Sequence, residues 1–150
     1  MGYTHYWYQR ADVPAETWEL IRADVRRLLQ ATEVPLAYEQ DMPTRPPEIS
    51  DTLIRFNGAG VHGFETFRLT RDIAGRRLRD GETFDFAKTN RRNYDGVVCA
   101  VLAIAAGHAP QCYRIASDGD EDDWAGPLSW ASRILGREVA LPLRRDTETG

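Results

Sequence analysis

The feature that most constrains the fold of this sequence is an apolar segment in its second half. The run from Val97 to Ala106 is almost wholly apolar and predicts a helix over roughly residues 94–107. A helix that is apolar on every side has no face suited to water, so we expect it to be central and buried. The run is about half of the ~20 residues that a bilayer requires, and it therefore does not predict a membrane span.

An aromatic segment at the N-terminus predicts the first strand of a sheet. Residues 3–9 are dense in aromatic and β-favouring side chains. Because successive side chains of a strand point to opposite faces, they divide into two sets. One set is Tyr3, His5 and Trp7, and the other is Thr4, Tyr6 and Tyr8.

The remaining segments complete an α+β pattern. Pro14 and the apolar spacing after it predict a helix to about residue 32, and three prolines predict an exposed loop over 41–50. Strands are predicted over 53–56, 61–69, 83–86 and 112–117, with a hairpin turn at Asn57-Gly58 and a last helix over 124–136. We therefore predict a single α+β domain over residues 1–143, with a mixed or antiparallel sheet and about three helices, the middle one buried. Residues 144–150 are predicted to be a flexible C-terminal tail.

The charge balance limits the class of partner. The net charge is −4 and the pI is about 5.4, which argues against duplex nucleic acid as the main partner, because phosphate neutralisation dominates that affinity. The N-terminus lacks a basic-then-apolar leader, so we expect a cytoplasmic protein with no membrane partner. Cys99 and Cys112 form no CxxC motif and are interpreted as reduced core thiols.

Familiar catalytic and metal motifs are missing from the sequence. Lys88-Thr89 lacks the glycines that precede the end of a phosphate-binding loop. Asp118, Asp120 and Asp122 match the start of a calcium loop, but the glycine and glutamate that complete it are absent. The three histidines have no metal-ligand spacing and there is no GxSxG motif. We therefore predict no metal and no cofactor.

A basic group before the apolar helix is the first candidate site. Lys88, Thr89, Arg91 and Arg92 precede the predicted helix N-terminus, where free N–H groups and the helix dipole favour an anion. Lys88 is the single lysine among 19 basic residues, and lysine supplies a compact point charge that arginine does not. The alternative is that these residues cap the helix and pair with carboxylates such as Asp85 or Asp95.

Two further groups could carry chemistry. In the aromatic strand, Tyr3 and Trp7 could stack on a flat ring of a ligand, while His5 forms a hydrogen bond or transfers a proton. The alternative is that Tyr3 and Trp7 are core residues and that His5 is a polar neighbour whose hydrogen bonds are satisfied. Glu65 lies on an apolar strand face, so it needs a partner such as Lys88, an arginine or His5. In the acidic turn 117–124, Asp118 and Asp120 could bind a cation or ligand hydroxyls, or cap the last helix.

Three segments together resemble a family of small bacteriophage and prophage proteins. They are the N-terminal GYTHYW motif, FDFAKT with Tyr94-Asp95, and SDGD with Asp123-Trp124. The resemblance brings no activity, but it implies that His5, Lys88, Thr89, Asp95, Asp118 and Asp120 belong to one pattern. It also implies an accessory protein in the host cytoplasm that acts on host metabolism or defence, by sequestering a nucleotide signal or by binding a host protein.

These observations favour a small protein that binds a small anionic ligand, and a nucleotide or nucleotide signal is one ligand that fits the residues. In this hypothesis Lys88 and Arg92 hold phosphate, Tyr3 or Trp7 stacks a base, and Asp118 or Asp120 holds ribose hydroxyls. The full predicted ligand-binding set is Tyr3, His5, Trp7, Lys88, Thr89, Arg91, Arg92, Asp95, Asp118 and Asp120.

Two alternatives remain open. One is an enzyme that carries out hydrolysis or group transfer on a phosphorylated or nucleotide substrate, with His5 or Glu65 as general base and Lys88 as electrophilic stabiliser. In this alternative a metal could bind at the aspartates of the acidic turn. The other is an inhibitor that binds a host enzyme through the proline-rich loop or the acidic turn.

Overall fold

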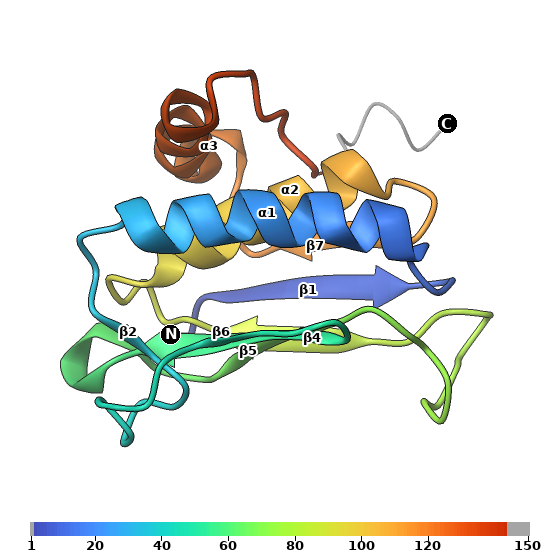
Figure 1. Cartoon of the computed structure of the whole chain (residues 1–150), viewed down its shortest axis with the longest axis horizontal. Coiled ribbons are helices and arrows are strands. Elements are labelled where there is room, and N and C mark those ends of the chain that lie inside the picture. Colours follow the sequence, from blue (N-terminus) through green and yellow to red (C-terminus); the bar gives the residue numbers. More distant parts are fainter. Residues whose placement is uncertain (1, 144–150) are drawn as a thin grey trace.

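The computed structural model describes residues 2–143, which form three α-helices among seven short strands (Figure 1). The helices are α1 (Ala15–Ala31), α2 (Asp95–His108) and α3 (Glu121–Leu135), with one 3-10 turn at Gly60–His62. The strands are β1 (Thr4–Gln9), β2 (Leu36–Ala37), β3 (Glu48–Ile49), β4 (Leu53–Gly58), β5 (Phe67–Thr70), β6 (Asp85–Lys88) and β7 (Tyr113–Ser117). The predicted α+β class and the three helices are confirmed.

The strands form two antiparallel sheets. In the first, β1 lies between β6 and β7, and Tyr6 is opposite Phe86 on one side and Ala116 on the other. In the second, β4 pairs with β2, β3 and β5. The sheets meet where the Glu65 carboxylate accepts the backbone N–H of Lys88 at 2.7 Å and the Glu65 N–H donates to the Lys88 carbonyl at 3.2 Å. Glu65 therefore has a partner in Lys88, through the backbone of that residue.

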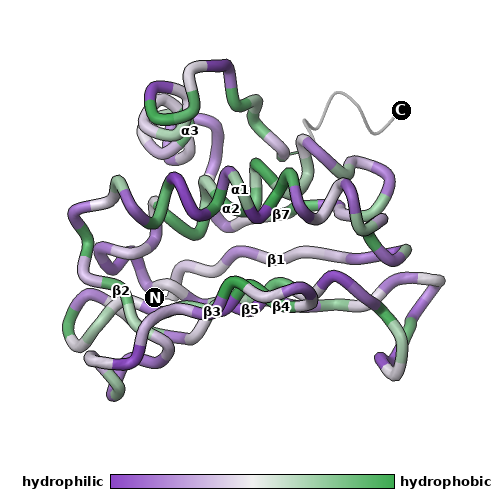
Figure 2. The backbone as a smooth tube through the Cα atoms, viewed as in Figure 1, coloured by the Kyte–Doolittle hydropathy of each residue, from purple (hydrophilic) through white to green (hydrophobic). Residues whose placement is uncertain are grey.

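Helix α2 is the centre of the molecule, as its composition requires. Every residue from Val97 to Ala105 is buried, and the helix packs against α1 and α3. The hydrophobic segments in Figure 2 run along α2 and along β4 and β5. One face of β1 completes this core, because Trp7 packs on Phe67 with 5.1 Å between ring centroids.

The hairpin predicted at Asn57-Gly58 is wrong in detail. Asn57 and Gly58 belong to β4, and the chain returns only at Phe67, after the 3-10 turn. The Asn57 carboxamide oxygen accepts the N–H groups of Gly58 and Phe64 at 2.8 and 3.1 Å. This side chain holds together a wider loop, so the tight two-residue turn is not needed.

The connection into α2 also differs from the prediction. Lys88 ends β6, and the loop 89–94 separates it from the helix, which begins at Asp95. Asn90 and Arg91 both have positive φ, 54° and 57°, a region that costs energy for side chains other than glycine. Lys88 is therefore separated from the helix by six residues of bent chain, and Asp95 provides a negative charge in the first turn of α2.

The predicted tail, residues 144–150, lies outside the described residues. Within residues 2–143 no helix combines the length and the apolar character needed to cross a membrane. Cys99 and Cys112 are both free and buried, as expected for core thiols.

A buried carboxylate joins α1 to the rest of the helical layer. Asp24 on α1 is 8% exposed, and its Oδ2 lies 2.7 Å from Nε2 of His108 at the end of α2 and bonds to Arg137 after α3. Burial by itself would raise the pKa of Asp24, but the hydrogen bonds from Arg137 and His108 outweigh it and hold the pKa below its usual range. The charged form of Asp24 therefore stabilises the folded state.

Replacing Asp24 should make the protein both less stable and less sensitive to acid. Because its folded pKa is depressed, the contribution of Asp24 is present above the unfolded pKa and is lost as the pH falls through the folded pKa. We expect Asp24→Asn to lower the free energy of unfolding at pH 7 by about 2 kcal/mol and to flatten the acid limb of the stability profile. Urea unfolding between pH 7 and pH 3 measures both, with Glu33→Gln, an exposed residue just after α1, as control. A variant profile parallel to the wild type would contradict this role.

Candidate functional site

The two faces of strand β1 have different environments. Its inward side chains, His5, Trp7 and Gln9, are buried, whereas Thr4, Tyr6 and Tyr8 are partly exposed on the opposite face. All of the core described above lies on the inward face. The outward face of the sheet β6-β1-β7 is therefore open, and its side chains are available to a ligand.

Four aromatic rings gather on this open face, and we name them the aromatic platform: Tyr6, Tyr8, Phe84 and Phe86. Phe84 and Phe86 are 50% and 54% exposed. Phe84 is central, with ring centroids 6.0 Å from Tyr6, 5.3 Å from Tyr8 and 5.9 Å from Phe86. Large apolar side chains that are contiguous and exposed are uncommon on soluble proteins and indicate a binding surface.

Cationic side chains border one end of the aromatic platform. A cleft of about 990 Å³ lies beside Tyr8 and Phe84, and its lining includes Arg77, Arg79 and Arg114. The guanidinium of Arg114 lies over the Tyr8 ring, 3.9 Å from its centroid. Within residues 2–143, Arg77 and Arg79 form no ion pair.

Two further cations lie at the other end of β6. Lys88 follows Phe86 by two residues, so strand alternation places it on the same face. Its Nζ lies 5.6 Å from the centroid of the Phe64 ring, and Cζ of Arg92 lies 5.8 Å from the same centroid. In the part of the chain that the structure describes, neither Lys88 nor Arg92 has a carboxylate partner. Both charges remain available to an anion.

Most acidic side chains near the aromatic platform are already engaged. Glu82 accepts hydrogen bonds from Arg114 at 2.8 Å and from Arg10 at 3.5 Å. Asp118 accepts the backbone N–H of Thr4 at 3.0 Å and the hydroxyl of Tyr6 at 3.2 Å. The two arginines offset the negative charge of Glu82, whereas the hydrogen bonds of Asp118 come from neutral groups and leave its charge in place.

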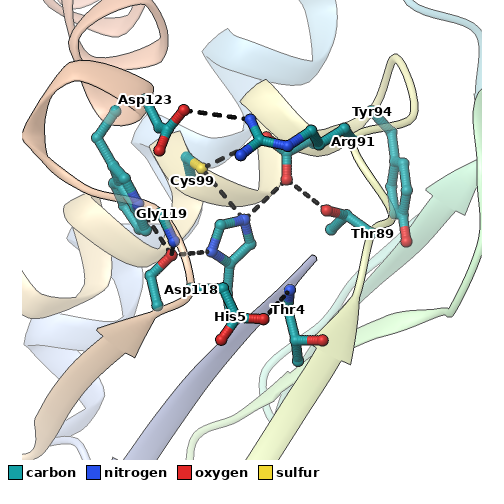
Figure 3. Close-up of polar contacts among 12 residues, drawn as sticks. Thr4, His5, Thr89, Arg91, Tyr94, Cys99, Asp118, Gly119 and Asp123 are labelled. Atoms are coloured by element: carbon teal, nitrogen blue, oxygen red, sulfur yellow. Dashed lines mark hydrogen bonds and ion pairs between the residues drawn. The ribbon is translucent and has the colours of Figure 1, made fainter. Parts of the chain in front are cut away.

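The inward face of β1 carries a buried polar network centred on His5 (Figure 3). His5 is 0% exposed. Its Nδ1 lies 2.7 Å from Oγ of Ser117 on β7, and its Nε2 lies 2.7 Å from Oδ1 of Asp95 on α2. The Thr89 hydroxyl donates to the same Asp95 oxygen at 2.5 Å. We name these four side chains, His5, Ser117, Asp95 and Thr89, the His5 network.

Counting donors and acceptors assigns the tautomer of His5. Oγ of Ser117 accepts the N–H of Gly119 at 2.9 Å and the indole N–H of Trp124 at 3.2 Å, which uses both of its lone pairs. The Ser117 hydroxyl must then donate to Nδ1 of His5. A neutral imidazole whose Nδ1 accepts carries its proton on Nε2, and this proton is donated to Asp95.

The count of hydrogen-bond donors and acceptors around His5 also shows how well these residues would suit a metal ion. Asp95 and Cys99 are four residues apart on α2 and face His5, so the three side chains bring ligand-type atoms within 4.8 Å of one another. A metal on Nε2 would require Nδ1 to be protonated, and Ser117 would then face three donors with two lone pairs. The hydrogen bonds therefore fit a structural network better than a metal centre.

Six of the ten ligand-binding residues predicted from the sequence fall into three groups in the structure. His5, Thr89 and Asp95 join the buried His5 network. Lys88 and Arg92 each lie near the Phe64 ring, 5.6 and 5.8 Å from its centroid. Arg91 lies over the Tyr3 ring at 3.8 Å and pairs with Asp123 at 3.1 Å, so it is engaged within the protein.

The acidic turn mainly caps structure. Asp120 is the N-cap of α3 and forms a reciprocal capping box with Asp123. Asp118 binds Thr4 and Tyr6 at the edge of the aromatic platform, so it is the one predicted acidic residue close to the open face.

Tyr3 and Trp7 cannot stack a base in this structure, contrary to the hypothesis drawn from the sequence. They are 5% and 2% exposed, because both lie on the core face of β1. The rings that are open to solvent are those of Tyr6, Tyr8 and Phe86 on the opposite face, together with Phe84 just before β6. Period-two alternation shows that the two sets are separate, but not which of them faces the core.

Comparison with protein-family models, with curated proteins and with solved structures gives no match to this chain.

Removing the Ser117 hydroxyl should destabilise the fold. Ser117→Ala leaves three groups without a partner, so we expect the free energy of unfolding to fall by about 3 kcal/mol. Nitrogen-15 NMR of the wild type should show the proton of His5 on Nε2. Ser129→Ala on the exposed face of α3 is the matched control and should change neither value. A wild-type proton on Nδ1 would contradict the assignment.

Proposed function

We propose that this protein binds nucleotides on the open face of the sheet β6-β1-β7. The observation that carries the proposal is the aromatic platform, in which Phe84 and Phe86 are exposed and Tyr6 and Tyr8 are partly exposed on one sheet face. The cations at its borders that have no carboxylate partner within residues 2–143 are Arg77, Arg79, Lys88 and Arg92. Every nucleobase has a flat π-face, and stacking on an aromatic side chain contributes about 1–3 kcal/mol per base. The sheet provides the rings and the cations provide charge for phosphate.

The phosphate end of the proposed site is formed by Lys88 and Arg92. Both lie about equally far from the Phe64 ring and neither is neutralised by a carboxylate within residues 2–143. Arg92 also donates to the Val61 carbonyl at 3.5 Å, which helps to hold its side chain in place. A phosphate placed between the two cations would accept charge-assisted hydrogen bonds from both.

The contacts of the proposed catalytic residues favour binding over turnover. His5 has no exposed surface, and both of its ring nitrogens are engaged with Ser117 and Asp95. Glu65 holds the backbone of Lys88. A general base must reach the proton that it removes, and in this structure these two groups reach partners within the protein instead.

One set of experiments can test both nucleotide binding and its dependence on the residues of the open sheet face. Differential scanning fluorimetry and calorimetric titration with adenosine and guanosine mono- and triphosphates and with a short single strand should show ligand-dependent stabilisation of the wild type. We expect Phe86→Ala and Lys88→Ala each to weaken the affinity about tenfold or more while the melting temperature without ligand stays nearly unchanged.

The controls are side chains of the same kind on the helical side of the molecule. Leu20→Ala removes an equally exposed apolar group, 55% exposed on α1, and Arg26→Ala removes an exposed cation from the same helix. Both should bind as the wild type does. Absence of stabilisation by every ligand tested, or equal loss of affinity in the control variants, would overturn the proposal.

A further inference from the structure

The shape of the open face indicates a ligand longer than one nucleotide, which is a step that rests on the proposed function. One base covers about one ring, whereas the aromatic platform offers four rings in two neighbouring rows. Phe84 and Tyr8 form one row, and Phe86 and Tyr6 form the other, with Phe86 opposite Tyr6 in the strand register. A single base would leave at least one row exposed.

The cations flank the pair of rows on two opposite sides, one group before the first row and one beyond the second row along β6. Arg77 and Arg79 line the cleft beside Tyr8 and Phe84, at the start of β6. Lys88 and Arg92 lie at the other end of the strand. From Phe84 to Lys88 a strand advances about 13 Å, at about 3.3 Å per residue. Phosphate sites separated by stacking rings in this order match the order of groups along a single strand.

We propose that the occupant is a single-stranded nucleic acid of at least two or three nucleotides that runs along β6 and β1, from the Arg77–Arg79 cleft to Lys88 and Arg92. Its bases stack on the two rows of the aromatic platform and its phosphates contact the cations at both ends. A duplex keeps its bases stacked inside, so it cannot use this surface. The acidic net charge of −4 is compatible with such binding, because stacking supplies much of the affinity and few phosphates are neutralised.

A length series distinguishes this inference from the proposed function. Calorimetry or fluorescence anisotropy with the full chain would compare a mononucleotide, a dinucleotide, a hexamer of deoxythymidine, the same hexamer in RNA, and a hairpin duplex. We expect the hexamers to bind at least tenfold more tightly than the mononucleotide, and the duplex to bind more weakly than the hexamers. The logarithm of the affinity should fall with the logarithm of salt concentration with a slope of about −2, as for two to three phosphate contacts on a single strand.

Variants at the two ends test the path of the strand. Arg79→Ala and Lys88→Ala should each weaken binding of the hexamer about tenfold and make the salt slope shallower, and Arg26→Ala should do neither. Equal affinity for mononucleotide and hexamer would overturn this inference and leave the proposed function standing. Binding by neither would overturn both. A dimer in sedimentation that dissociates in Phe86→Ala, with no nucleic acid bound, would show that a second copy covers the face and would also overturn both.

Discussion

The hydrogen bonds of the buried His5 hold the rest of the structure in place. His5 on β1 bonds to Ser117 on β7 and to Asp95 on α2, and through these residues it is linked to Thr89 and Trp124. One imidazole thereby joins the sheet to the central helix and to α3. A partly satisfied polar network would destabilise a core, and here every nitrogen of the ring has a partner. The network also fixes the rotation of β1 about its own axis, which decides which side chains face solvent.

That rotation separates structural from binding roles along one strand. Side chains alternate along β1, so a residue that points inward is followed by one that points outward. His5 is followed by Tyr6, and Trp7 is followed by Tyr8. The N-terminal aromatic segment thus supplies core packing and the proposed stacking surface at once. The lone lysine at the end of β6 lies on this outer face, and its charge is left unpaired among the described residues.

The sequence predicts more of the fold than of the site. Helix α2 is predictable because an apolar run of this length is stable only when it is buried. The C-terminal end of α1 at Ala31 is also close to the predicted end at about residue 32. The orientation of β1 is not predictable, since both of its faces carry aromatic rings and the choice depends on Asp95 and Ser117, which are distant in the sequence. Lys88 and Arg92 are found from the charge pattern, but the positive φ values of the loop between them, at Asn90 and Arg91, leave no clear trace in composition.

The central claim is that the outer face of β1 binds the ligand and the inner face supports the fold. The most direct measurement is a titration of the isotope-labelled protein with a short single-stranded oligonucleotide, followed by NMR of aromatic side chains. The account predicts shift changes at the rings of Tyr6, Tyr8, Phe84 and Phe86, with the His5 imidazole signals unchanged. Changes centred on His5, with the outer rings unaffected, would contradict it.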